Sequence, residues 1–325
     1  MVCPGRWRVD GRQATVTRRR GAHARATTEA ARLRTLPLAS ACVLTGGALA
    51  AAAGTEQARF TPLFAGCLLT VVLLQVLANF ANDLGDFTNG ADRAAGHQRS
   101  DRAVASGRIS AAQMKRAVAA AGALALLVGS STVIWAAGDH ILTVLFWIGM
   151  GILSIGAAYT YTAGHRPYGY SGLGDISVLV FFGLAGVAGT AALITGTFAA
   201  VWILPSLSIG LFSVAVLNLN NLRDHTSDAV TGKHTLVVRM GFDRAKVYHA
   251  LLLGGAWGSL LAFWALDAGG PWHGKLWYGL FALVHIKHLA LVFRTQDPAE
   301  LDGELKKVAL STFAISLFLF LSATA

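Results

Sequence analysis

The residues of this chain best suited to chemistry are a cluster of acids and amides at the end of a very apolar segment. Its members are Asn79, Asn82, Asp83 and Asp86, with Asp92 a few residues further on. On a helix the first four are spaced i, i+3, i+4 and i+7, which places them on one face. Carboxylates this close repel one another unless a cation lies between them, and Mg²⁺ binds through one or two carboxylates, water and phosphate oxygens. The cluster therefore predicts a magnesium site. Its candidate metal ligands are Asp83, Asp86 and Asp92, and its candidate substrate contacts are Asn79 and Asn82.

A second cluster of the same kind follows another apolar segment in the other half of the chain. Asn221, Asp224 and Asp228 are spaced i, i+3 and i+7, again on one helical face. Acidic residues beside membrane-spanning helices are costly, so they are functional candidates. We predict that Asp224 and Asp228 are metal ligands and, like Asp83 and Asp86, catalytic residues. Asn221 is predicted to contact the substrate.

Basic residues near these clusters are suited to binding a diphosphate. Arg223, Lys233 and Arg239 accompany the second cluster, and Arg166 lies in another polar loop. Lysine supplies a compact charge and arginine a two-pronged fork for phosphate or carboxylate groups. Lys233 is predicted to be catalytic and the three arginines to bind substrate. The alternative is that they belong only to the positive charge of cytoplasmic loops. With the metal site, they indicate a phosphorylated, lipid-like substrate.

A third candidate segment is rich in tyrosine. Tyr159, Tyr161 and Tyr168 precede Asp175, which opens the next apolar run. Aromatic faces can stabilise a carbocation, and phenol groups can bind phosphate or an aromatic acceptor, so these residues are predicted to contact substrate. Tyrosine is also common at membrane interfaces, and an acid at the start of a helix can serve the helix dipole alone. The residue types leave both interpretations open.

The elements that position these residues must be membrane helices. The 325-residue chain is 54% hydrophobic and only 14% charged, whereas soluble proteins carry about 25% charged residues. Apolar runs of roughly 18 or more residues mark membrane spans. We therefore predict an all-α polytopic membrane protein with about nine transmembrane helices around a central cavity. The expected spans are 36–54, 61–80, 117–137, 141–160, 173–195, 199–219, 247–266, 275–293 and 308–324.

The distribution of Lys and Arg predicts how these spans are oriented. Residues 1–35 contain nine arginines, and the connections 81–116 and 220–246 contain six and five basic residues. The alternate connections contain almost none, so the N-terminus and both acidic clusters are expected on the cytoplasmic side. We predict a basic cytoplasmic arm at 1–32 and one intramembrane domain at 33–325. The net charge of +10 follows from this bias and requires no nucleic-acid partner.

Three stretches of the sequence together resemble a known family. They are Asn79-x-x-Asn82-Asp83-x-x-Asp86 with Gly90-x-Asp92, Arg166-Pro-Tyr-Gly-Tyr-x-Gly-Leu-Gly-Asp175, and Asn220-Asn221-x-Arg223-Asp224-x-x-x-Asp228 with Gly232-Lys233 and Arg239-x-Gly241. The pattern resembles the UbiA-type intramembrane prenyltransferases. Within them it is most similar to the branch that acts on 1,4-dihydroxy-2-naphthoate in menaquinone biosynthesis. The similarity extends from about residue 33 to the C-terminus.

The resemblance implies that the two clusters face each other across Mg²⁺. It implies prenyl transfer from a polyprenyl diphosphate to 1,4-dihydroxy-2-naphthoate, with loss of CO₂ and diphosphate, giving demethylmenaquinone at the bacterial inner membrane. The matching metal-site residues are Asn82, Asp83, Asp86, Asp92, Asp224 and Asp228. One departure is visible between Asp92 and Gly107, where this branch tends to carry a Gly-Pro-Leu segment that is absent here.

Two other functions share much of this pattern. Prenylation of another aromatic acceptor, such as 4-hydroxybenzoate, uses the same aspartates. A cation-coupled transporter also has intramembrane carboxylates and related halves. Transporter carboxylates lie near the middle of the bilayer, however, whereas these are expected at helix ends. The pattern does not predict oligomeric state or isoprenoid length.

Overall fold

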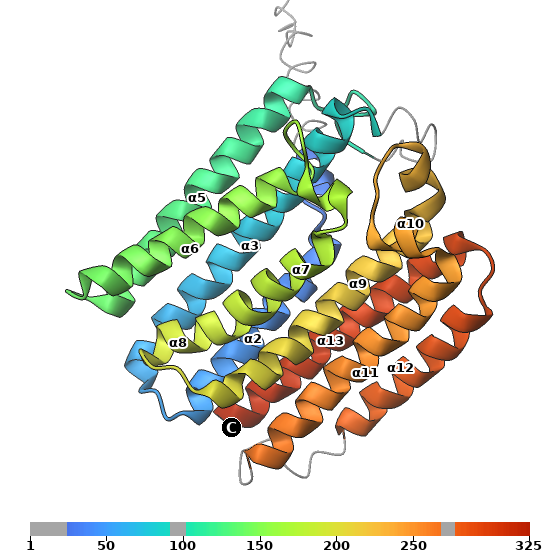
Figure 1. The fold of residues 1–325 in the computed structure, drawn as a ribbon. Helices are drawn as coiled ribbons and strands as arrows, with labels where there is room; N and C mark the ends of the chain where they lie inside the picture. The colour runs from blue at the N-terminus through green and yellow to red at the C-terminus, as the bar shows by residue number, and fades with distance from the viewer. Residues whose placement is uncertain (1–24, 92–101, 268–276) are drawn as a thin grey trace, which may run out of the picture.

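The computed structural model describes residues 25–91, 102–267 and 277–325 of the chain. Within these ranges the chain is all α, with long helices, short turns and no strands (Figure 1). Eight helical segments are long and apolar enough to cross a membrane, which confirms the predicted fold class. They are Arg25–Ala52, Gln57–Thr88, Ala111–Ala137, Ile141–Thr160, Gly174–Thr195, Ala200–Val230, Phe242–Leu266 and Pro298–Thr324.

These segments contain the labelled elements of Figure 1. The first four hold η1 (Leu33–Thr35) with α2 (Leu36–Ala52), α3 (Gln57–Thr88), α5 (Ala111–Ala137) and α6 (Ile141–Thr160). The fifth is built from α7 (Gly174–Val178), η4 (Leu179–Ala188) and α8 (Gly189–Thr195), of which η4 is a π-helix. The last three hold η5 (Ala200–Trp202) with α9 (Ile203–Val230), α11 (Phe242–Leu266), and η6 (Pro298–Glu300) with α13 (Leu301–Thr324).

The ninth predicted span corresponds to α12 (Trp277–Arg294), which lies beside α11 and α13 (Figure 1). This helix has 18 residues but is not among the eight that meet the criteria of length and hydropathy. Its interior carries His285, Lys287 and His288. The count of nine spans therefore stays a prediction.

Two helices extend well beyond the spans that hydropathy predicts. The prediction ended the second span at residue 80 and the sixth at residue 219, but α3 continues to Thr88 and α9 to Val230. The helix α3 ends there because Asn89 is the C-cap and Gly90 takes a positive φ of 80°. The described residues of both acidic clusters thus lie on regular helix. The backbone fixes where each side chain points.

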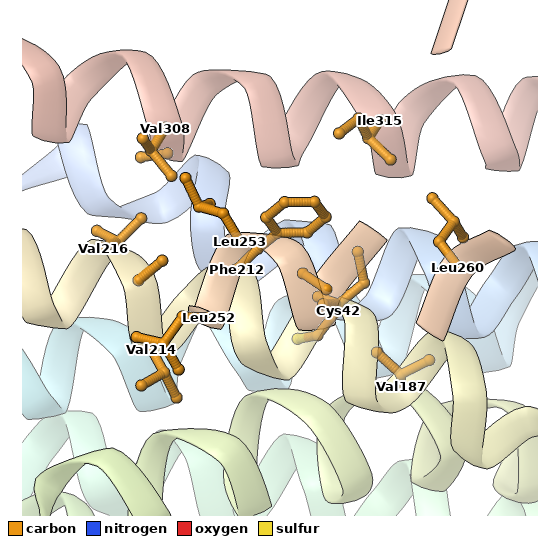
Figure 2. Close-up of a cluster of buried hydrophobic side chains, with 14 of the residues drawn as sticks. Cys42, Val187, Phe212, Val214, Val216, Leu252, Leu253, Leu260, Val308 and Ile315 are labelled. Carbon is orange, nitrogen blue, oxygen red and sulfur yellow. The ribbon is translucent and has the colours of Figure 1, made fainter. Parts of the chain in front are cut away.

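The main core lies where α2, η4, α9, α11 and α13 meet (Figure 2). Phe212 is fully buried there among Cys42, Val187, Leu253 and Ile315. The approach of η4 to α9 requires glycine. A Cβ atom added at Gly183 would lie 2.6 Å from the carbonyl oxygen of Ser206, and a Cβ at Gly210 would lie 3.1 Å from the Cα of Gly183. This pair of glycines brings α9 against the rest of the bundle.

A chain of buried polar side chains fastens α12 to its neighbours. The Nε2 atoms of His249 on α11 and His288 on α12 lie 2.8 Å apart, and His288 Nδ1 lies 2.7 Å from Glu304 Oε2 on α13. His285 of α12 in turn contacts Ser311 of α13 at 2.7 Å. Histidine side chains in an apolar bundle need such partners. These contacts tie three helices together on the far side of α9 from η4.

Candidate functional site

The ends of α3 and α9 and the loops around them enclose a polar cavity of about 370 Å³. Three carboxylates of the two aspartate clusters line it: Asp86, Asp224 and Asp228. The amides Asn82, Asn220 and Asn221 line it as well. Residues of both clusters therefore line one cavity, and their predicted roles in binding metal and substrate stay predictions. The site is formed because α3 and α9 end at the same side of the bundle (Figure 1).

Asp86 accepts bonds from several side chains in this cavity. The carboxylate is 2% exposed, and its Oδ1 atom accepts hydrogen bonds from Lys233 Nζ and the Tyr170 hydroxyl, each at 2.6 Å. Its Oδ2 atom lies 2.7 Å from a guanidinium nitrogen of Arg102. The Lys233 ammonium also lies 4.7 Å from the centre of the Tyr170 ring, within the range of a cation–π contact. Two cations and a phenol thus converge on one carboxylate.

The acids of α9 are arranged differently. Arg223 binds Asp224 through two nitrogens, at 2.9 and 3.0 Å, and reaches Asp302 of α13 at 2.5 Å. It also donates to the Asn220 side chain at 2.8 Å. Asp228 lies one turn further along and is 3% exposed. The guanidinium therefore faces two carboxylates, and it is available to a more strongly charged anion only if it leaves one of them.

The tyrosine-rich loop packs directly against the first cluster. The Thr162 hydroxyl donates to the Asn82 side chain at 2.7 Å. A Cβ at Gly85 would lie 2.4 Å from the Thr162 carbonyl oxygen, so only glycine permits this contact. Tyr161 lines the cavity, and burial raises the pKa of its phenol, which therefore stays neutral at physiological pH. A neutral aromatic wall thus stands beside the carboxylates.

Tyr168 of this loop and Arg239, which packs against the loop, have structural partners instead. The Tyr168 hydroxyl bonds to the Ala157 carbonyl at 3.0 Å and to Ser177 at 2.8 Å, and burial raises its pKa. Arg239, from α10 (Leu236–Met240), donates to the Ser171 and His234 carbonyls at 2.9 and 3.1 Å. Tyr168 is part of η3 (Tyr168–Ser171), which its hydroxyl joins to α6 and α7. Arg239 joins the other end of η3 to α10. The two residues hold the cavity wall in place.

Several predicted site residues do not line the main cavity. Asp83 faces Ala103, and Asn79 packs beneath the site, where it donates to the Ala31 carbonyl at 2.7 Å. Asp175 accepts a hydrogen bond from Tyr248 at 2.9 Å. Arg166 and Tyr159 are exposed, with 39% of Tyr159 accessible. Asp92 lies outside the described residues.

The predicted face of the first cluster is therefore too broad. At 3.6 residues per turn, the four residues from Asn79 to Asp86 spread over about 100° of arc. Asn82 and Asp86 occupy one side of that arc and line the cavity. Asp83 occupies the other side and points away from them.

Sequence reasoning missed some important residues of the cavity. Tyr170 and Arg102 both bind Asp86, and Arg32 and Arg34 also line the cavity. Tyr170 belonged to the tyrosine-rich segment, so its residue type was the available signal. Arg102 lies in the segment that departs from the family pattern, where no motif indicated a role. Asp302 comes from the start of α13, far from either cluster in sequence.

The cavity suits Mg²⁺ chemically. Among the described residues, no three Asp, Glu, His or Cys side chains are close enough to hold a metal by themselves. Mg²⁺, however, commonly takes one or two carboxylates and completes its octahedron with water and phosphate oxygens. Asp86, Asp224 and Asp228 supply only oxygen ligands, on two facing helices. The lining fits a metal bound together with a phosphorylated substrate.

Comparisons with known proteins agree with this arrangement. A 1,4-dihydroxy-2-naphthoate octaprenyltransferase of Haemophilus influenzae is 42% identical over 89% of this chain and 92% of its own. The Escherichia coli protein of the same name is also 42% identical, over 90% and 94%. A UbiA homolog from Archaeoglobus fulgidus, solved with DMAPP and Mg²⁺, superposes with a TM-score of 0.62 at 17% identity, covering 90% of this chain and 98% of that one. The apo UbiA homolog from Aeropyrum pernix gives 0.63 at 16% identity over 86% and 97%.

The family relationship covers nearly the whole helical bundle. The model of the UbiA prenyltransferase family matches residues 39–320, which include both aspartate clusters, the tyrosine-rich loop and all the helices from α3 to α12. With relatives at 42% identity over about nine tenths of their length, the chain belongs to the UbiA prenyltransferase family.

Proposed function

We propose that this protein transfers a polyprenyl group from polyprenyl diphosphate to 1,4-dihydroxy-2-naphthoate, with loss of CO₂ and diphosphate, giving demethylmenaquinone. The observation that carries the proposal is the cavity itself. It collects carboxylates of two helices and several basic side chains at one end of an apolar bundle. The relatives named for the naphthoate reaction favour this acceptor over 4-hydroxybenzoate, and favour an enzyme over a transporter.

In this proposal the donor diphosphate binds between the ends of α3 and α9. Asp86, Asp224 and Asp228 line this space and would hold Mg²⁺, which would supply the positive charge that favours departure of the diphosphate. Lys233 and Arg223 face the same space and supply positive charge to the leaving oxygens. The lysine ammonium already binds a carboxylate oxygen at 2.6 Å, which shows that it can reach an anionic oxygen in this cavity.

The ring of Tyr161 supports the second part of the reaction. Loss of diphosphate leaves an allylic cation, which an aromatic face stabilises and a dry wall protects from water. Tyr161 lines the cavity, and its ring meets that of Tyr168 edge to face with 5.4 Å between centroids. The isoprenoid tail extends into the bilayer along the apolar helices. The site is proposed to face the cytoplasm, at the bacterial inner membrane.

One assay tests this function directly. The purified protein is incubated with Mg²⁺, a labelled polyprenyl diphosphate and, separately, 1,4-dihydroxy-2-naphthoate, 4-hydroxybenzoate or homogentisate, and the lipid product is identified by mass. We expect a decarboxylated prenyl-naphthalenediol from the first acid and little product from the others. Turnover confined to 4-hydroxybenzoate, or release of diphosphate without a prenylated ring, would contradict the proposal.

A further inference from the structure

A second cavity, of about 690 Å³, adjoins the first on the other side of the α3 cluster. The two share Arg32, Arg34 and Arg102, and Asp83 lines only the second. The shared arginines form a wall between them. A group bound at this wall is therefore next to the cavity that receives the diphosphate.

Asp83 presents an unused acceptor in this second cavity. The residue is 2% exposed, and its Oδ2 atom accepts the Ala103 N–H at 3.1 Å. Its Oδ1 atom is buried and has no hydrogen-bond partner. Buried carboxylate oxygens are nearly always paired, so an oxygen left in this state indicates a missing donor. A ligand hydroxyl would supply one.

Arg32 places a cation at the shared wall, within electrostatic reach of Asp83 and Asp86. In the described part of the chain, Arg102 binds Asp86 and Arg108 binds Glu29, but no hydrogen bond or ion pair holds the Arg32 guanidinium. The Arg32 backbone is also unusual, with φ 48° and ψ 60°, the single non-glycine residue of the described ranges with positive φ. Such conformations are unfavourable and are concentrated at functional sites.

A ligand that satisfies both groups has a carboxylate for Arg32 and a neighbouring hydroxyl for Asp83. We propose that this is the aromatic acceptor of the prenyl transfer, an ortho-hydroxy aromatic acid. Its carboxylate binds Arg32 at the wall between the cavities, and its hydroxyl donates to Asp83 Oδ1. This inference rests on the proposed function and deepens it, since it assigns the acceptor to the second cavity and makes Asp83 an acceptor-binding residue instead of a metal ligand.

This placement fits the chemistry of the transfer. The C–O bond of the donor breaks and diphosphate departs with the electron pair. The ring carbon that carries the carboxylate then forms a bond to the allylic carbon. The bond from that ring carbon to the carboxylate breaks, its electron pair returns to the ring, and CO₂ leaves, so no net proton is consumed. Asp83, by accepting from the ortho hydroxyl, raises the electron density at the attacked carbon.

Binding of three related naphthalenes, without donor or metal, tests the assignment. The probes are 1-hydroxy-2-naphthoate, 2-naphthoate and 1-naphthol, followed by their own fluorescence on the purified full-length protein. Wild type is expected to bind the first most tightly. Arg32→Gln should weaken the binding of the two probes that carry a carboxylate by roughly 10-fold to 100-fold. The affinity for 1-naphthol should stay unchanged. Arg116→Gln, an exposed arginine on α5, is the matched control and should change none of them.

Asp83→Asn tests the hydroxyl contact separately. The Ala103 N–H requires an acceptor, so the new amide turns its oxygen there and points its NH₂ at the ligand. The affinity for 1-hydroxy-2-naphthoate should then fall to that for 2-naphthoate. The affinities of the three probes are compared within one variant. A variant that fails to fold loses the binding of all three, whereas a folded Asp83→Asn loses only the preference for the hydroxyl.

Three results would overturn the inference: no binding by wild type, equal binding of 1-naphthol and 1-hydroxy-2-naphthoate, or unchanged carboxylate affinity in Arg32→Gln. Steady-state turnover separates this failure from failure of the proposed function. If the naphthoate is prenylated and Arg32→Gln raises the KM of the donor alone, only the inference fails. If wild type does not prenylate the naphthoate, the proposed function itself fails.

Discussion

The Lys233 ammonium lies 2.6 Å from Oδ1 of Asp86, although the two residues are 147 positions apart in the chain. This ion pair joins the loop after the second aspartate cluster to the helix of the first. In the proposed reaction both partners bind the donor, one through a metal and one directly. A diphosphate with its metal would compete for each of them.

The lysine is expected to be essential for turnover. Lys233→Met removes the cation nearest Asp86 and should reduce kcat by about 100-fold to 1000-fold, the usual effect of losing one stabilising group at a leaving oxygen. Lys115→Met, at an exposed position of α5, should retain wild-type rates. The comparison is made by product formation at saturating substrates. A Lys233→Met enzyme with more than half of the wild-type kcat would exclude a catalytic role.

The two carboxylates that share Arg223 should differ strongly in importance. Asp224 lines the cavity on the same helix as Asp228, so Asp224→Asn should lower activity by about 100-fold or more. The Asp302 side chain is 61% exposed, and exposed ion pairs contribute only about 0.2–1 kcal/mol. Asp302→Asn should therefore change activity by less than about tenfold. Equal losses in the two variants would contradict this distinction.

Removal of divalent cations should abolish turnover. The fit of the cavity lining to Mg²⁺ with phosphate oxygens predicts that metal and diphosphate bind together. Thermal unfolding in detergent should show stabilisation by Mg²⁺ plus inorganic diphosphate and a much smaller effect of either alone. Full activity in excess EDTA, after prior metal stripping, would rule out the metal site.

The Tyr168 hydroxyl is expected to stabilise the loop in a pH-independent way. Burial raises the pKa of this phenol in the folded protein. The stabilisation from its hydrogen bonds to Ala157 and Ser177 is therefore fully present below the pKa of the unfolded chain. It is lost only as the pH rises through the pKa of the folded protein. Tyr168→Phe should lower unfolding free energy by about 1 kcal/mol. Denaturation at pH 6 and pH 8.5 should give the same difference. A difference that disappears at the higher pH would show that the phenol ionises in the folded protein.

The charge bias also predicts the orientation of the bundle. Single cysteines at Thr231 and Asp139, in a background with the native cysteines replaced by serine, report the loops after α9 and α5. Thr231→Cys should react with a membrane-impermeant maleimide only after the cytoplasmic side is opened. Asp139→Cys should react in intact cells. The reverse pattern would place the aspartate clusters on the outer side.

The sequence indicated that residues of the two clusters lie near one cavity, but not which residues of each cluster line it. Helical spacing places Asn82 on the same face as Asp86, and Asn221 on the same face as Asp228. This placement depends only on the helix and can be predicted from the sequence. The same rule does not say which cavity Asp83 lines, because a face about 100° wide can border two cavities. Which cavity a residue joins depends on the segment after Arg102, which packs against α3 and supplies the Ala103 N–H.

Roles that depend on contacts between distant segments could not be predicted. Tyr170 and Tyr168 are two positions apart, yet one binds Asp86 and the other a neighbouring helix. Arg166 and Arg239 had the right residue type for anion binding, but the structure leaves the first exposed and gives the second to backbone carbonyls. Hydropathy located the apolar part of α3 and α9 and missed their polar last turns, since a helix that leaves the membrane no longer needs apolar residues.

The histidine contacts of α12 bear on how the protein is made. His285 and His288 find their partners on α11, which precedes α12, and on α13, which is synthesised last. Until α13 emerges from the ribosome, the inner side of α12 presents imidazoles that hydrocarbon cannot solvate. If α12 is the predicted ninth span, we expect its stable insertion to require the last helix, and truncation of the chain before Glu304 should leave α12 at the membrane surface, open to quality-control proteases.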